Sequence, residues 1–69
     1  MKGYQERVVQ EHKELVDRLN KLLCFLQSEQ YMNLTDIHMS LFLAQYQAMQ
    51  TYGVILETHI SLFEKENQT

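Results

Sequence analysis

Residues 36–66, DIHMSLFLAQYQAMQTYGVILETHISLFEKE, carry apolar side chains in two neighbouring rows at helical spacing. The first, here the His38 row, consists of His38, Leu41, Gln45, Ala48, Tyr52, Ile55, His59 and Leu62. The second, here the Met39 row, consists of Met39, Phe42, Tyr46, Met49, Gly53, Leu56, Ile60 and Phe63. Each row steps by three and four residues without a slip, which is the period of one helix face. The stretch therefore predicts one long helix.

A second amphipathic pattern covers residues 3–27. Its apolar stripe comprises Val8, Leu15, Leu19, Leu22 and Leu26, and only His12 interrupts it. The polar stretch 28–35 separates the two patterns, and either Asn33 or Thr35 can cap the second helix. We therefore expect one all-α domain over residues 1–69, with helix 3–27, connection 28–35 and helix 36–66 folded back as an antiparallel two-helix hairpin.

Two apolar rows on one helix also predict self-association. A single partner helix in a hairpin covers one row, and we expect the Met39 row to remain on the surface. Its large side chains are Phe42, Tyr46, Met49, Ile60 and Phe63. A contiguous apolar strip of that size on a small protein usually marks an interface. The sequence thus predicts that the hairpins assemble into a homo-oligomeric helical bundle through these residues.

Size and composition limit what else the chain can contain. It has 69 residues, a formal net charge of −3, no proline and one cysteine, Cys24. One cysteine makes no internal disulfide, and no Cys/His quartet has the spacing of a structural zinc site. A net negative charge argues against a DNA or RNA binder, which normally has a basic face. No segment has the pattern of an export signal or a membrane span, so we expect a soluble protein.

The first helical turns contain the densest cluster suited to ligand recognition. Tyr4 offers a stacking face, and Arg7 offers a planar fork for phosphate next to the free N–H groups of a helix start. Arg18 and Lys21 are further candidates for phosphate contacts. In the alternative interpretation, Tyr4 covers the end of the apolar stripe and Arg7 is a solvated or ion-paired surface residue. His12 is either a hydrogen-bonded core histidine or part of a polar pocket between subunits.

The sequence contains no recognisable catalytic or metal-binding motif. It has no GxSxG elbow, no kinase-like set and no Gly-rich loop. His38 and His59 are too far apart on one helix to share a metal ion, and Cys24 has no acid or base at catalytic spacing. We therefore expect no enzymatic activity, no metal site within one chain and no cofactor.

The residues YQERVVQEHKELVDRLNKLLCFL resemble a family of very small bacteriophage proteins with a Tyr-Gln-x-Arg-Val motif. The positions that carry the resemblance in the first helix are Tyr4, Gln5, Arg7, Val8, Glu14, Leu15, Lys21, Leu22 and Phe25. Those in the second helix include Gln45, Ala48, Met49 and Tyr52. The resemblance spans most of the chain and implies a phage protein that acts in the host cytoplasm.

In architecture the chain also resembles the phage anti-CBASS sponge proteins. These are short helical hairpins that form hexamers and withhold cyclic oligonucleotide signals from host effectors. They open with Gly-Tyr-Arg and stack the tyrosine on a base, whereas here Gly3-Tyr4 is followed by Gln5, and Leu19 occupies the position of the family's lysine. The resemblance implies a site for a cyclic oligonucleotide or cyclic ADP-ribose type ligand.

Two functional hypotheses follow from these observations. The first is a sponge, an oligomer that sequesters a small nucleotide in pockets between subunits, with Tyr4 on the base and Arg7 and Arg18 or Lys21 on phosphate. The second is a protein-interaction module, a helical hairpin that docks on a host or phage protein and inhibits or scaffolds it. In neither hypothesis does the protein bind DNA or a membrane.

Overall fold

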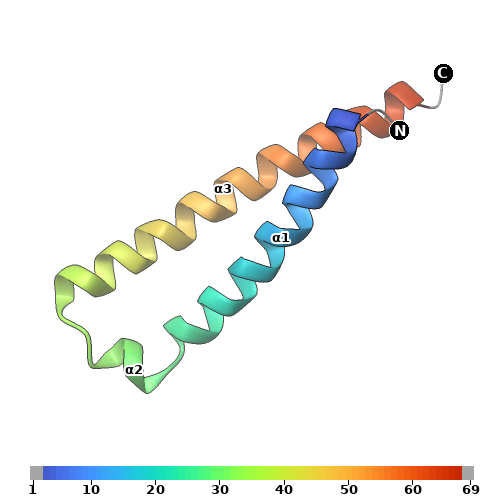
Figure 1. The fold of residues 1–69 in the computed structure, drawn as a ribbon. Helices are drawn as coiled ribbons and strands as arrows, with labels where there is room; N and C mark the ends of the chain where they lie inside the picture. Colours follow the sequence, from blue (N-terminus) through green and yellow to red (C-terminus); the bar gives the residue numbers. More distant parts are fainter. Residues whose placement is uncertain (1–2, 68–69) are drawn as a thin grey trace.

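The computed structural model describes residues 3–67 and contains helices only. Figure 1 shows α1 (Gly3–Leu26), the short α2 (Glu29–Met32) and α3 (Asp36–Asn67) in chain order. No strand occurs within residues 3–67. The all-α fold class predicted from the sequence is therefore confirmed. Residues 1, 2, 68 and 69 of the expected domain lie outside the described residues.

The connection between the long helices is more ordered than the sequence pattern predicted, because it contains α2. Ser28 ends α1 and starts α2, since its Oγ donates to the Phe25 carbonyl at 2.6 Å and accepts from the Tyr31 backbone N–H at 3.2 Å. The buried Tyr31 then donates its hydroxyl to the Met39 carbonyl at 3.0 Å. These bonds fix the connection to both long helices.

The helices α1 and α3 lie side by side and run in opposite directions (Figure 1). At one end, the rings of Tyr4 and Phe63 are 5.6 Å apart between centroids, and at the other end those of Phe25 and Phe42 are 5.0 Å apart. The chain is consequently a rod of 53 × 15 × 15 Å. None of the helices within residues 3–67 has the length and apolarity needed to cross a membrane.

Gly53 lies where α3 packs against α1. A Cβ atom placed there would be 3.7 Å from Leu15 Cδ2 and 4.0 Å from Leu19 Cδ1. Leu15 is 4% exposed, and Leu56, three residues after Gly53, is 3% exposed. The Met39 row of α3 therefore faces α1 and supplies the small core of the molecule.

The structure contradicts the expectation that the Met39 row remains on the surface, on which the predicted oligomer interface was based. The five residues assigned to it, Phe42, Tyr46, Met49, Ile60 and Phe63, lie on the face of α3 that α1 covers, and all of them are half-buried or buried within the single chain. The outward-facing row is the His38 row, in which Leu41 is 60% exposed and Ile55 is 48% exposed. The two rows have the same spacing, so periodicity alone could not decide which one α1 would cover.

Replacing Gly53 with alanine is expected to stabilise the protein. The added methyl group would make ordinary van der Waals contacts with Leu15 and Leu19, and φ at Gly53 is not positive. A glycine inside a helix costs about 0.5–1 kcal/mol relative to alanine. Gly53→Ala should therefore raise the midpoint of thermal unfolding by several degrees when circular dichroism is followed at fixed protein concentration. A lower midpoint would contradict the helix spacing described here.

Truncating the core should be far more costly than truncating the surface of the same helix. Leu56→Ala is expected to lower the free energy of unfolding by about 2–5 kcal/mol, because it opens a cavity against α1. Leu43→Ala is the matched control, since Leu43 is 48% exposed and surface changes are usually worth less than about 0.5 kcal/mol. Urea unfolding measures both variants, and equal losses would be incompatible with the assigned helix faces.

Candidate ligand site

Tyr4 lies in the first turn of α1, and its side chain is accessible. It is 47% exposed, and its ring stands edge-on to Phe63 at an interplanar angle of 87°. Phe63 is itself buried and stacks with His59 at a centroid distance of 6.0 Å and an angle of 25°. Tyr4, Phe63 and His59 thus form a three-ring group, here called the aromatic cluster, at the end of the rod away from α2.

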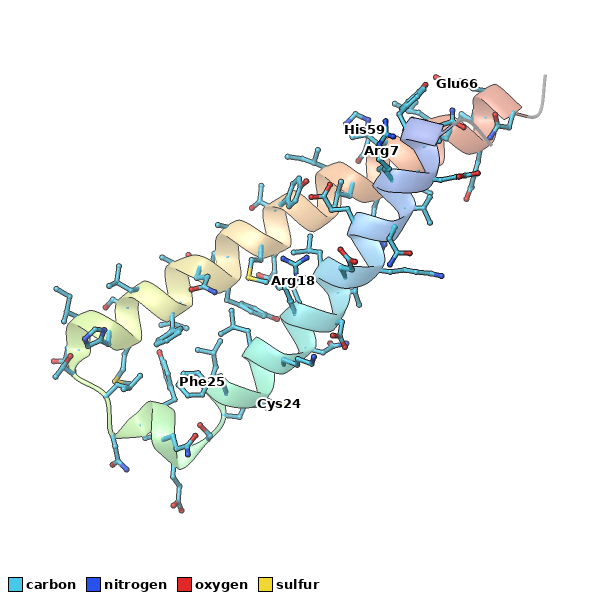
Figure 2. The ribbon with its side chains drawn as sticks, in the orientation of Figure 1. Arg7, Arg18, Cys24, Phe25, His59 and Glu66 are labelled. Atoms are coloured by element: carbon cyan, nitrogen blue, oxygen red, sulfur yellow. The ribbon has the colours of Figure 1, made fainter. Side chains whose placement is uncertain are left out.

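Arg7 lies one turn after Tyr4 and is exposed. In Figure 2 it is drawn at the same end of the molecule as His59. Among the ion pairs formed within residues 3–67, none involves Arg7. The end of the rod therefore combines an aromatic surface with a guanidinium group that no carboxylate of the described residues neutralises. This combination suits a planar ring that carries a phosphate.

The other two predicted ligand residues lie elsewhere on α1. Arg18 follows Tyr4 by fourteen residues, which corresponds to about 21 Å along a helix. Its guanidinium lies 3.7 Å from Glu14 Oε2, and Lys21 Nζ lies 3.0 Å from Asp17 Oδ2. One chain therefore brings Tyr4 and Arg7 together but does not bring Arg18 or Lys21 to them. Only another copy of the chain could place Arg18 or Lys21 beside Tyr4.

Gln5 is a residue of this region to which the sequence analysis assigned no role in the site. It is 1% exposed although its neighbours Tyr4 and Glu6 are on the surface. Asn67 Nδ2 donates to its Oε1 at 3.5 Å, which fixes the last turn of α3 to the first turn of α1. The signal was available, because Gln5 precedes His12 by seven residues and so continues the core stripe of α1. The buried Gln5 thus holds the first turn of α1, from which Tyr4 projects, against α3.

His12 lies at the contact between α1 and α3. Its side chain is 23% exposed, and its Nε2 lies 3.3 Å from Glu57 Oε1, a hydrogen bond when that nitrogen carries the proton. The structure thus gives His12 a partner on the facing helix of the same chain. This contact supports its interpretation as a hydrogen-bonded histidine in the helix interface.

A polar contact also joins α1 to the His38 row. The Glu11 carboxylate accepts a hydrogen bond from the Tyr52 hydroxyl and raises the pKa of Tyr52 above its ordinary value of 10.0. Partial burial and the negative charge of Glu11 act in the same direction, whereas the positive charge of Arg18 opposes them. The flank of α1 that contains Glu11 and Arg18 therefore borders the outward-facing row of α3.

The described residues show no group of three or more His, Cys, Asp or Glu side chains arranged to hold a metal ion. His38 and His59 lie on the same face of α3 but twenty-one residues apart. Their separation along the helix is about 31 Å.

Comparison with known proteins identifies the family. Residues 2–62 match the Sequestin family. The chain belongs to the Sequestin family. It is also 33% identical over 64 residues to the "Uncharacterized 7.5 kDa protein in denB-rIIB intergenic region" of Enterobacteria phage T4, and the alignment covers 93% of this chain and 100% of the T4 protein. No solved structure matches the chain.

The predicted resemblance to a family of small bacteriophage proteins is confirmed by these matches. The Sequestin match includes all of α1 and α2 and continues along α3 as far as Leu62. It therefore contains Tyr4, Arg7 and the complete His38 row. Phe63, the ring on which Tyr4 rests, is the first residue after the matched segment.

Removing the Glu11 carboxylate should lower the pKa of Tyr52 toward 10.0. The shift in the folded protein is upward, so the Glu11 contact stabilises the fold at pH values below 10.0, and this contribution is lost as the pH rises through the folded-state pKa. NMR titration of labelled tyrosine rings in Glu11→Ala measures the effect. Asp17→Ala, which removes a carboxylate from the Lys21 pair, should leave the Tyr52 titration unchanged. An unaltered titration in Glu11→Ala would exclude the contact.

Proposed function

We propose that this protein is a non-enzymatic phage sponge, which binds a small nucleotide-type signalling molecule and withholds it from host anti-phage defence. The family name points to sequestration, and the T4 relative is a phage protein of similar length. Sequestration requires a binding site and enough copies of the protein, but no chemical turnover. The protein would act in the host cytoplasm, where such signals reach their effectors.

The observation that carries this proposal is the accessible aromatic cluster at the free end of the rod. Tyr4 is 47% exposed although it rests against a buried phenylalanine. Packing against Phe63 therefore limits the motion of the Tyr4 ring while part of the ring remains available. A ring held in place loses little conformational entropy on binding, which favours stacking with a nucleobase.

Arg7 supplies the second element that a nucleotide needs. It projects from the turn that follows Tyr4, close to the start of α1, where the first backbone N–H groups lack helical partners. The Arg7 guanidinium and the free N–H groups of the helix start both favour an anion. A guanidinium binds phosphate through a planar pair of donors. A cyclic oligonucleotide or a cyclic ADP-ribose isomer presents both a base for Tyr4 and a phosphate for Arg7.

A complete pocket would form between subunits of a homo-oligomer. The described part of one chain offers a rod without a deep cavity at Tyr4, and it places Arg18 and Lys21 about 21 Å or more along α1 from that residue. Neighbouring copies would bring additional side chains around the same ligand. Assembly thus belongs to the proposed mechanism, because enclosure removes the ligand from water and from competing receptors.

The alternative function is a protein-interaction module that docks on a host or phage protein and inhibits or scaffolds it. The observation in its favour is the exposed apolar His38 row, in which Leu41 is 60% and Leu62 is 48% exposed. Native mass spectrometry with and without a nucleotide pool separates the two functions. A sponge should give a closed homo-oligomer that carries small ligands, whereas the module should bind none.

Under the sponge proposal, Tyr4→Ala should weaken binding about ten- to hundredfold, because stacking on an aromatic ring contributes about 1–3 kcal/mol per base. Tyr4→Phe keeps the ring and should bind nearly as well as the wild type. Arg7→Ala should also weaken binding, and that loss should shrink at high salt because a phosphate contact is screened. Calorimetric titration with cyclic di- and trinucleotides and cyclic ADP-ribose isomers measures each variant.

The control for this experiment is Asn20→Ala, which changes an exposed polar residue on α1 far from Tyr4. Circular dichroism should show the same helicity in all four variants. If the wild type binds none of these ligands, the sponge proposal is refuted. Equal binding by the wild type and Tyr4→Ala would retain a sponge but exclude Tyr4 from its site.

A further inference from the structure

The outer face of α3 is unusually apolar for a surface. Residues 37–56 contain no Asp, Glu, Lys or Arg, although the helix is 32 residues long and only one of its faces packs against α1. On the His38 row, Leu41 is 60%, Ile55 is 48% and Leu62 is 48% exposed. A helix that is apolar on more than one face is normally buried on more than one face.

This face also contains a shaped depression. Ile55, Thr58, His59 and Leu62 line it together with Val54, and its volume is about 200 Å³. The first four occupy positions i, i+3, i+4 and i+7 of one helix. Those four positions make up the hole that receives one side chain of a facing helix in knobs-into-holes packing. The depression therefore has the size and the lining positions of a hole that accepts one large aliphatic side chain.

We propose that the occupant is a second copy of this chain, whose α3 packs antiparallel along the His38 row and inserts Leu41 into the depression. The inference rests on the homo-oligomer of the proposed function and assigns its interface. With Leu41 of one copy at the level of His59 of the other, the seven-residue spacing of the row determines the other pairs. Ala48 then faces Tyr52, Gln45 faces Ile55, and His38 faces Leu62.

Self-complementarity is the reason for choosing a second copy over another partner. The same row supplies the inserted side chain, Leu41, and the hole around His59. In a two-fold symmetric pair, Leu41 of each chain therefore fills the hole of the other chain. The smallest residue of the row, Ala48, meets its largest, Tyr52, again twice. Large and small side chains in facing positions give close packing without voids.

The antiparallel direction follows from the polar members of the row. A parallel pair would place each residue opposite its own copy, so that His38 would face His38 and His59 would face His59. It would also leave the large Tyr52 opposite another Tyr52 and the small Ala48 opposite another Ala48. The antiparallel pair sets each histidine against a leucine and aligns the helix dipoles favourably.

The contact also continues the packing already present in the chain. The Met39 row and the His38 row step along α3 with the same seven-residue repeat. A repeat of seven produces a left-handed supercoil, so both neighbours of α3 would follow the same twist. The helix α3 would thus contact α1 along one row and a second α3 along the neighbouring row, about 100° around the helix.

Sedimentation equilibrium on the full chain tests the interface. The wild type should contain two or more chains per particle at micromolar concentration, and Ile55→Glu should reduce the particle to one chain. Leu43→Glu is a matched control, because Leu43 is on α3, is also 48% exposed and lies outside the His38 row. It should leave the mass unchanged. A monomeric wild type, or an unchanged mass in Ile55→Glu, would overturn the proposal.

A milder variant guards against misfolding. Leu41→Ala shortens the proposed knob at a position that is 60% exposed in the single chain. It should weaken association at least tenfold, while circular dichroism retains the helicity of the wild type. Full association in Leu41→Ala would exclude Leu41 from the interface.

Disulfide trapping in a Cys24→Ser background tests the direction. When Gln45→Cys and Ile55→Cys chains are mixed and oxidised, the antiparallel register should produce mixed dimers, with little crosslinking in either variant alone. A parallel pair would instead crosslink each variant to itself, which would overturn the assigned direction. These experiments use no nucleotide. A chain that associates as described but binds none of the cyclic nucleotides would therefore refute the sponge and leave the interface intact.

Discussion

The close approach of α1 and α3 at Gly53 is the constraint on which the rest of the structure depends. A disulfide within the chain is impossible with only one cysteine, and three of the four buried hydrophobic side chains of the described residues lie in the contact between α1 and α3. Gly53 lies on the buried face of α3, and a Cβ atom there would meet Leu15 and Leu19 of α1 at ordinary contact distance. That approach brings Leu56 and Phe63 into the interior, and Phe63 in turn supports Tyr4. The ligand end of the rod is thus positioned by a contact about ten residues away.

Much of the fold could be predicted from the sequence because both long helices follow an uninterrupted period. Periodicity could not choose between the two rows of α3, since they share the same spacing. Composition could have decided the question. The Met39 row contains no strongly polar side chain, whereas the His38 row contains His38, Gln45 and His59. The short helix α2 was missed because its stability comes from Ser28 and Tyr31, whose bonds reach Phe25 and Met39 and have no periodic signature.

The candidate site was predictable only as far as local sequence extends. Tyr4 and Arg7 are neighbours on one helix, so their spacing indicated that they act together. The rise of a helix also shows that Arg18 is about 21 Å from Tyr4. Arg18 and Tyr4 of one chain therefore cannot belong to the same site. Phe63, His59 and Asn67 reach this end only because α3 returns along α1. Contacts between residues some sixty positions apart depend on the register of two helices, and that register is set by packing rather than by any motif.

The aromatic cluster connects the two proposals physically. His59 lines the depression that would receive Leu41 of a second chain, and the same ring stacks on Phe63, which supports Tyr4. A second copy seated on the His38 row would therefore restrict the motion of His59 and, through Phe63, that of Tyr4. A ring that is already ordered loses less entropy when a ligand stacks on it. Since coupling between two binding events is reciprocal, a ligand on Tyr4 would strengthen association of the chains by the same factor. A chain with so small a core would then retain its ligand most tightly in the assembled state, which is the state that encloses it.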